Sequence, residues 1–243
     1  MKKSIQIFTL IFLGFSFLVS GQMNYEISTF ETYIQSRYKE LTPLEETKPP
    51  FDLYRRGMIG YYDLLANDKK IANQKITLID FRISSNKKRF WVIDIKSNKV
   101  IHYRLVAHGK NTGEEYAKTF SNKKNSNQSS LGFYITAETY LGKHGLSLRL
   151  DGQEKGFNDQ VRNRAVVMHS ANYVSKDFAR KYGRLGRSYG CPAIAVKDHK
   201  VVIQGLAKGS LLFIYYPEAN YEAKTLLNNV ELASKYYIQN SDL

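Results

Sequence analysis

The sequence is poor in the residues and patterns that define several large protein classes. Cys191 is the only cysteine among 243 residues, so no disulfide can form within the chain. No H-E-x-x-H motif or comparable ligand spacing is present, which argues against a zinc enzyme. RNA-binding, zinc-finger and basic-helix motifs are also missing. We therefore expect no metal, no other cofactor and no nucleic acid.

Long apolar runs are absent beyond Val19, which argues against a membrane-spanning segment in the rest of the chain. Residues 1–21 have the three parts of a signal peptide: a basic head, an apolar run from Ile5 to Val19, and the small residues VSG. The alternative, a membrane anchor, is disfavoured because spanning needs roughly 20 apolar residues. No cysteine follows VSG, so a lipoprotein signal does not fit. The pattern predicts an exported protein.

Basic side chains outnumber acidic ones, with 36 Lys and Arg against 22 Asp and Glu. Loss of the leader with its two lysines leaves 34 basic and 22 acidic residues, a net charge of +12. Such a surface attracts anionic partners. For an exported protein, a polyanionic cell envelope fits this charge better than nucleic acid does. A basic surface that serves only solubility is the plainer alternative.

Residues 76–217 have the pattern of a mainly β domain, because short runs rich in Ile, Val, Phe and Tyr alternate with turn residues. Residues 22–75 read as an N-terminal arm with a helical segment over 51–66, where apolar residues recur at helical spacing. Residues 218–243 read as a C-terminal tail or surface helix. The expected strands are ITLIDFRIS, RFWVIDIK, VIHYRLVAHG, LGFYITAETYLG, LSLRLDG, RAVVMHSA and GSLLFIYYP.

The stretch RLGRSYGCPAI around Cys191 is unlike the surroundings of a buried structural cysteine. Free cysteines are commonly buried as small hydrophobic residues. Here, however, glycines allow tight backbone paths and Pro192 cannot continue a strand ladder. His169 follows an apolar strand upstream, and an imidazole can take the proton of a thiol. Backbone N–H groups of a tight turn can stabilise an oxyanion. The pair predicts a cysteine nucleophile with a histidine base.

The motif VVMHSANY, a glycine-rich loop and then SYGC together resemble the L,D-transpeptidase catalytic domain, the YkuD-like family. The family signature is a histidine followed by Gly or Ser, a loop, and then Ser-x-Gly-Cys. The phrases LVAHGKN, GKHG and GRLGRSYGCPA are similar to an exported murein subfamily of Gram-negative bacteria. The resemblance covers about residues 76–216. It implies a β-sandwich-like catalytic fold that acts on peptidoglycan stem peptides in the periplasm or cell envelope.

The resemblance also implies a role for each residue of the motif. Cys191 would be the nucleophile and His169 the base. Ser170 would orient the imidazole through its backbone carbonyl. Gly190 and Cys191 would supply N–H groups to the oxyanion, with Tyr189 as a further candidate.

Two positions depart from the family pattern. Many members have histidine where Tyr189 stands, and arginine or asparagine where Ala193 stands. Substrate contacts are therefore expected to differ, and Arg184 or Arg187 could lower the thiol pKa or bind a substrate carboxylate. The alternative for both arginines is a solvated surface. Ser188 is expected to brace the turn by hydrogen bonding.

Two further histidines, His108 and His144, each precede a glycine and end or flank a strand, so they are candidates to line the cleft. His102 lies inside a strand pattern and His199 in a polar helix start, so both are expected to be structural or solvated.

Three functions fit these residues. The first is a transpeptidase that passes an acyl group from a tetrapeptide stem, through a Cys191 thioester, to an amine acceptor and forms a 3→3 cross-link. The second is an L,D-carboxypeptidase or endopeptidase that uses the same site with water. The third is an envelope-binding module without catalysis. Neither the acceptor nor the oligomeric state follows from the sequence.

Overall fold

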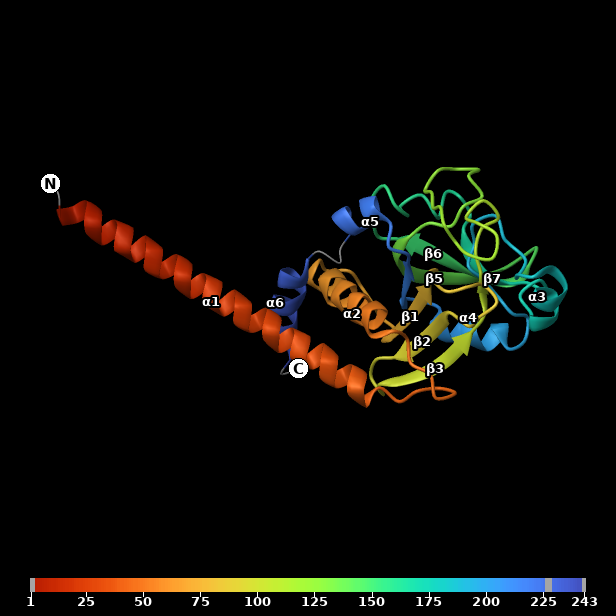
Figure 1. Ribbon diagram of the computed structural model, residues 1–243, viewed down its shortest axis with the longest axis horizontal. Coiled ribbons are helices and arrows are strands. Elements are labelled where there is room, and N and C mark those ends of the chain that lie inside the picture. Colours follow the sequence, from red (N-terminus) through yellow and green to blue (C-terminus); the bar gives the residue numbers. More distant parts are fainter. Residues whose placement is uncertain (1–2, 226–228, 242–243) are drawn as a thin grey trace.

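The computed structural model describes residues 3–225 and 229–241, with side chains described from Gly21 onward. The predicted class, mainly β with flanking helices, is confirmed (Figure 1). The strands are β1 (Lys75–Asp80), β2 (Phe90–Asp94), β3 (Lys99–Arg104), β4 (Val106–Ala107), β5 (Gly132–Gly142), β6 (Gly145–Gly152), β7 (Val167–Ser170), β8 (Ala193–Ile194) and β9 (Leu211–Tyr215). The helices are α1 (Lys3–Glu40), α2 (Phe51–Ala66), α3 (Lys176–Tyr182), α4 (His199–Leu206), α5 (Ala219–Lys224) and α6 (Val230–Asn240).

The strands form one sheet in the order β3-β2-β1-β9-β5-β6-β7-β8-β4. β3 and β4 stand at opposite ends of this order, although only Leu105 separates them in the chain. The chain therefore crosses from one edge of the sheet to the other at Leu105, and the sheet curls into a nearly closed barrel. This curling leaves few unpaired strand edges.

The core is centred on β9, which is buried along its whole length between β1 and β5. Its unbroken apolar sequence LLFIY is typical of a strand covered on both faces. Phe213 of β9 stacks on Phe133 of β5 with 4.2 Å between ring centroids. A Cβ added to Gly60 of α2 would lie 2.0 Å from Phe133 Cζ. A glycine that weakens helix propensity therefore lets α2 lie directly on the aromatic core.

The N-terminal arm and the C-terminal tail pack together. Within α1, Phe30 and Ile34 are fully buried, and Tyr33 shares a hydrogen bond of 3.0 Å with Tyr62 of α2. The ring of Tyr237 in α6 lies 4.4 Å from that of Tyr33. The arm, for which a helical segment was predicted only over 51–66, is thus also helical up to Glu40. α1, α2 and α6 form one helical layer beside the sheet (Figure 1).

Several local predictions are confirmed, including the helix over 51–66, the helix that starts at His199, and the strand that ends near His169. The short helix α3 was not predicted. Its N-cap is Ser175, whose hydroxyl accepts from the Phe178 N–H, and its C-cap is Gly183, which has a left-handed conformation.

The predicted leader stays a prediction, because residues 1–2 and the side chains of 3–20 lie outside the described residues. In the described parts of the chain, no helix combines the length and apolarity that crossing a membrane requires.

Candidate active site

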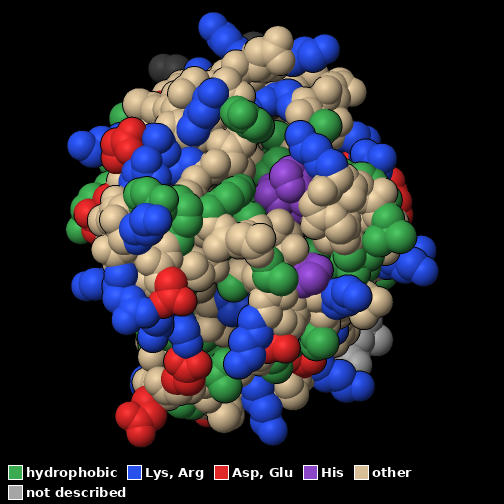
Figure 2. All heavy atoms as spheres, turned by 90° about the vertical axis from the view of Figure 1, so that its right-hand side faces the viewer, with side chains coloured by type: hydrophobic (Ala, Val, Ile, Leu, Met, Phe, Trp, Pro, Cys, Tyr) green, Lys and Arg blue, Asp and Glu red, His purple; other side chains and the backbone are tan. Residues whose placement is uncertain are grey.

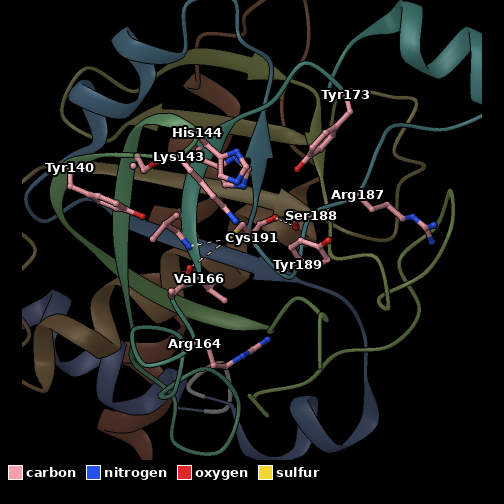
Figure 3. Close-up of a pocket in the computed structure, with 15 residues that line it drawn as sticks. Tyr140, Lys143, His144, Arg164, Val166, Tyr173, Arg187, Ser188, Tyr189 and Cys191 are labelled. Carbon is pink, nitrogen blue, oxygen red and sulfur yellow. Dashed lines mark hydrogen bonds between the residues drawn. The ribbon is translucent and has the colours of Figure 1, made fainter. Parts of the chain in front are cut away.

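Strand pairing brings the predicted histidine and cysteine to the same end of the sheet. β7 runs parallel to β8, and His169 lies opposite Ala193. Cys191 stands just before β8, at the end of the loop that leads into it. Both side chains line a pocket of about 680 Å³ (Figure 3). On the face of the molecule that carries α3, histidine side chains reach the surface near the centre, and basic side chains are spread widely around them (Figure 2).

The Cys191 thiol lies against the residues that lead into β7. Its Sγ accepts a hydrogen bond from the Val167 N–H at 3.4 Å, and the S–H donates to the Ala165 carbonyl at 3.9 Å. Burial raises the pKa of Cys191, whereas the Val167 N–H and the positive charges of Arg164 and Lys143 lower it in part. The net shift is upward, so the thiol is protonated at neutral pH.

The His169 imidazole is oriented by its neighbour's backbone. Nδ1 lies 3.0 Å from the Ser170 carbonyl oxygen, so Nδ1 carries the proton and Nε2 is left as the acceptor. The ring is 3% exposed and stacks on His144 with 4.3 Å between centroids. Burial lowers the pKa of His169, and the charges of His144 and Lys143 lower it further. The imidazole is therefore neutral at neutral pH, as a general base must be.

The turn before Cys191 is held by Ser188. Its Oγ donates to the Cys191 carbonyl at 2.6 Å and accepts from the Gly190 N–H at 3.1 Å. The Gly190 N–H, expected to be an oxyanion donor, is therefore already engaged by the Ser188 side chain. Within the described residues, the N–H groups of Tyr189 and Cys191 make no hydrogen bond.

Gly190 is required at its position for two reasons. Its φ of 120° is rarely adopted by other residues, and a Cβ there would lie 2.7 Å from the Gln128 carbonyl oxygen. Ser129 Oγ donates to the Gly190 carbonyl at 3.2 Å and accepts from the Gly109 N–H at 3.0 Å. A Cβ on Gly109 would lie 3.0 Å from the Gly190 Cα. The loop between β4 and β5 thus packs directly on the turn that precedes Cys191.

The cleft-lining role predicted for His108 is wrong, because this side chain is only 1% exposed. Its Nδ1 accepts from the Arg89 guanidinium at 2.8 Å, and its Nε2 donates to the Gly113 carbonyl at 3.2 Å. Burial, together with the Arg89 charge, lowers the pKa of His108 to about 4. His108 is a structural residue that fixes the loop carrying Gly109. His144, by contrast, lines the pocket.

Arg184 and Arg187 are both paired with Glu114. Arg187 also donates to the Lys110 and Gly113 carbonyls and lines the rim of the pocket. Arg184 does not line it. The positive charges that act on the thiol come from other residues, so the pKa role expected of these two arginines is filled elsewhere.

Sequence reasoning did not single out several residues that line the pocket, among them Tyr140, Lys143, Arg164 and Tyr173. The GKHG turn between β5 and β6 gave a signal for Lys143, since it sits beside His144. Arg164 gave none. Its guanidinium donates to acceptors in the β4–β5 loop, among them the Gln128 carbonyl at 2.7 Å, and no carboxylate pairs with it in the described residues. Among those residues, no group of three His, Cys, Asp or Glu side chains is placed to hold a metal ion.

The family model described as the L,D-transpeptidase catalytic domain matches residues 45–215. No match was found among curated protein sequences.

Solved structures give weaker likenesses. An L,D-transpeptidase from Mycobacterium smegmatis is 12% identical, with 59% of each chain covered and a TM-score of 0.36. An L,D-transpeptidase from Mycobacterium tuberculosis H37Rv is 13% identical, with 59% of this chain and 58% of that one covered and a TM-score of 0.33. The chain thus spans about three fifths of the length of these structures, and the family assignment rests on the family model.

Proposed function

We propose that this chain, which belongs to the L,D-transpeptidase catalytic domain family, is a cysteine acyltransferase that acts on peptidoglycan stem peptides. The observation that carries the proposal is the shared pocket, in which the Cys191 thiol and the oriented His169 imidazole lie at one sheet end. Both groups are neutral at neutral pH, so the thiol must lose its proton as it attacks.

The first half of the reaction forms a thioester. Cys191 Sγ attacks the carbonyl carbon of the third stem residue, and the thiol proton passes to His169 Nε2. The tetrahedral intermediate then collapses. Its C–N bond to the terminal D-alanine breaks, and His169 gives the proton to the departing amine. Free D-alanine and an acyl-enzyme result.

The second half regenerates the enzyme. An amine of a neighbouring stem attacks the thioester, His169 takes its proton, and the C–S bond breaks as Cys191 recovers that proton. The product is a 3→3 cross-link. Exclusion of water from the thioester favours transfer over hydrolysis.

The oxyanion formed in each half needs hydrogen-bond donors. We assign the backbone N–H groups of Cys191 and Tyr189 to this role, because neither is used within the described residues. His144 and Arg187, which line the pocket, are the candidates to contact the stem peptide. The charge of Arg187 suits a stem carboxylate.

The cellular setting is part of the proposal. The predicted signal peptide would carry the chain out of the cytoplasm. The net charge of +12 that remains after loss of this leader, from 34 basic and 22 acidic residues, suits an anionic envelope.

Mass spectrometry of the purified protein incubated with tetrapeptide-stem muropeptides tests the proposal, with the Cys191→Ala variant as the control. We expect a dimer one D-alanine lighter than two monomers, and none with the variant. Tripeptide monomers alone would assign the site to a carboxypeptidase. Neither product, with no acyl-enzyme mass, would refute catalysis and favour an envelope-binding module.

A further inference from the structure

Tyr173 is a pocket residue to which neither the motif nor the mechanism assigns a role. It follows β7 closely, and its side chain lines the same pocket as Cys191 and His169. Figure 3 shows its hydroxyl directed into the pocket, on the side where Ser188 and Cys191 lie.

The Tyr173 side chain packs against Gly186 and Phe178. A Cβ added to Gly186 would lie 2.3 Å from the Tyr173 Cβ and 2.5 Å from its Cγ, so the Gly186 backbone packs against the ring. The Gly186 N–H donates to the Tyr173 carbonyl at 3.0 Å. The Phe178 ring stands 6.5 Å away in an edge-on arrangement. These contacts fix the direction of the hydroxyl without using it.

The hydroxyl itself is free to act as a donor. Within the described residues it makes no hydrogen bond, whereas the buried Tyr134 and Tyr221 hydroxyls donate to the Ser130 carbonyl and to Glu154. Burial, and the negative charge of an ionised Cys191, raise the pKa of Tyr173 to about 12. The phenol is therefore protonated at neutral pH and can donate a hydrogen bond.

The family resemblance leads one to expect the Gly190 N–H as an oxyanion donor. In this structure that N–H donates to Ser188 Oγ instead, so the oxyanion site lacks one donor. We propose that the Tyr173 hydroxyl supplies a hydrogen bond to the oxyanion of the tetrahedral intermediate formed on Cys191. This inference rests on the proposed function. The phenol keeps its proton throughout, so it changes no proton count in either half-reaction.

The Tyr173→Phe variant removes the hydroxyl and keeps the ring against Gly186. Two reactions of the same thiol separate the possible roles. Acylation by a tetrapeptide stem passes through an oxyanion, whereas alkylation by iodoacetamide is a direct displacement without one. Loss of one oxyanion donor typically costs about 10²–10³ in rate. We expect acylation to slow on the order of 10²-fold, with KM and the alkylation rate unchanged within about twofold.

Tyr182→Phe is the matched control, since Tyr182 lies in α3, is 54% exposed and does not line the pocket. It should acylate at the wild-type rate, and all three proteins should unfold at the same temperature. Acylation of Tyr173→Phe within about threefold of wild type would overturn the inference, as would an equal loss of acylation and alkylation, which would mean that Tyr173 acts on the thiol. Wild-type protein that forms no acyl-enzyme would refute the proposed function itself, and the inference would fall with it.

Discussion

Acid should destabilise this protein through His108, and the size of the effect follows from its surroundings. In the folded chain the imidazole is almost fully buried, and Arg89 donates to it at 2.8 Å. Protonation would place two positive charges in contact without water. The pKa of His108 is accordingly lowered to about 4, against about 6.5 in an unfolded chain.

The sign follows from proton binding. Between pH 6.5 and pH 4 the unfolded chain binds a proton at His108 that the folded chain does not, so the free energy of unfolding falls as the pH falls. The stabilisation is complete above about pH 6.5 and is lost by the time the pH has passed below 4. At roughly 1.4 kcal/mol per pKa unit, His108 alone accounts for about 3 kcal/mol.

Urea unfolding at several pH values between 7 and 4 measures this loss, and the His108→Gln variant isolates it. A glutamine amide can accept from Arg89 through oxygen and donate to the Gly113 carbonyl through nitrogen, but it does not titrate. Between pH 7 and pH 4, we expect the free energy of unfolding of the variant to fall by about 3 kcal/mol less than that of the wild type. Parallel pH profiles for the two proteins would refute the reasoning, as would an NMR titration of His108 near pH 6.5.

Three other substitutions test separate contacts. Arg164→Gln should raise the pKa of Cys191 further and thereby slow alkylation of the thiol by iodoacetamide at neutral pH, because the thiolate is the reacting form. An unchanged pH profile of alkylation would contradict the electrostatic role of this arginine. Gly60→Ala should lower the free energy of unfolding by about 1–3 kcal/mol, because its Cβ meets the Phe133 ring; urea midpoints equal to wild type would show that α2 packs differently. Ser188→Ala should lower the free energy of unfolding by about 2–3 kcal/mol, since two hydrogen bonds in the turn are lost. It should also slow acylation. Full activity and stability of the variant would show that the turn keeps its conformation without the hydroxyl.

Much of the fold was readable from local patterns. Alternating and continuous apolar runs located the strands, because each run is buried on one or both faces of the sheet. The pairing of β7 with β8 could not be read this way, since it joins segments separated by a long loop. The helical state of residues 22–40 was also missed, because its support comes from α2 and α6, through contacts such as that of Phe30 with Tyr237.

His108 and His144 show why side-chain roles are harder to predict than strands. Both precede a glycine at the end or edge of a strand, so the local pattern predicts the same cleft-lining role for each. His144 lies in the turn between β5 and β6 and faces the pocket, whereas His108 follows β4 and meets a fully buried arginine. Arg89 comes from another strand region, and nothing in the local pattern around His108 indicates that contact.

The turn that precedes Cys191 is supported by segments that are remote in sequence but contact one another in the fold. Arg89 fixes His108, His108 fixes the Gly113 carbonyl, and the loop so held presses Gly109 against Gly190. Because Gly190 adopts a φ of 120° with no room for a Cβ, a shift of this loop changes the position of the backbone that precedes the thiol. Acid protonation of His108 should therefore impair acylation before the whole chain unfolds, since the loop is anchored by a group whose pKa is about 4. In this fold the buried Arg89–His108 contact stabilises the β4–β5 loop, and that loop positions the backbone before Cys191. The stability of the loop and the reactivity of the thiol should therefore change together.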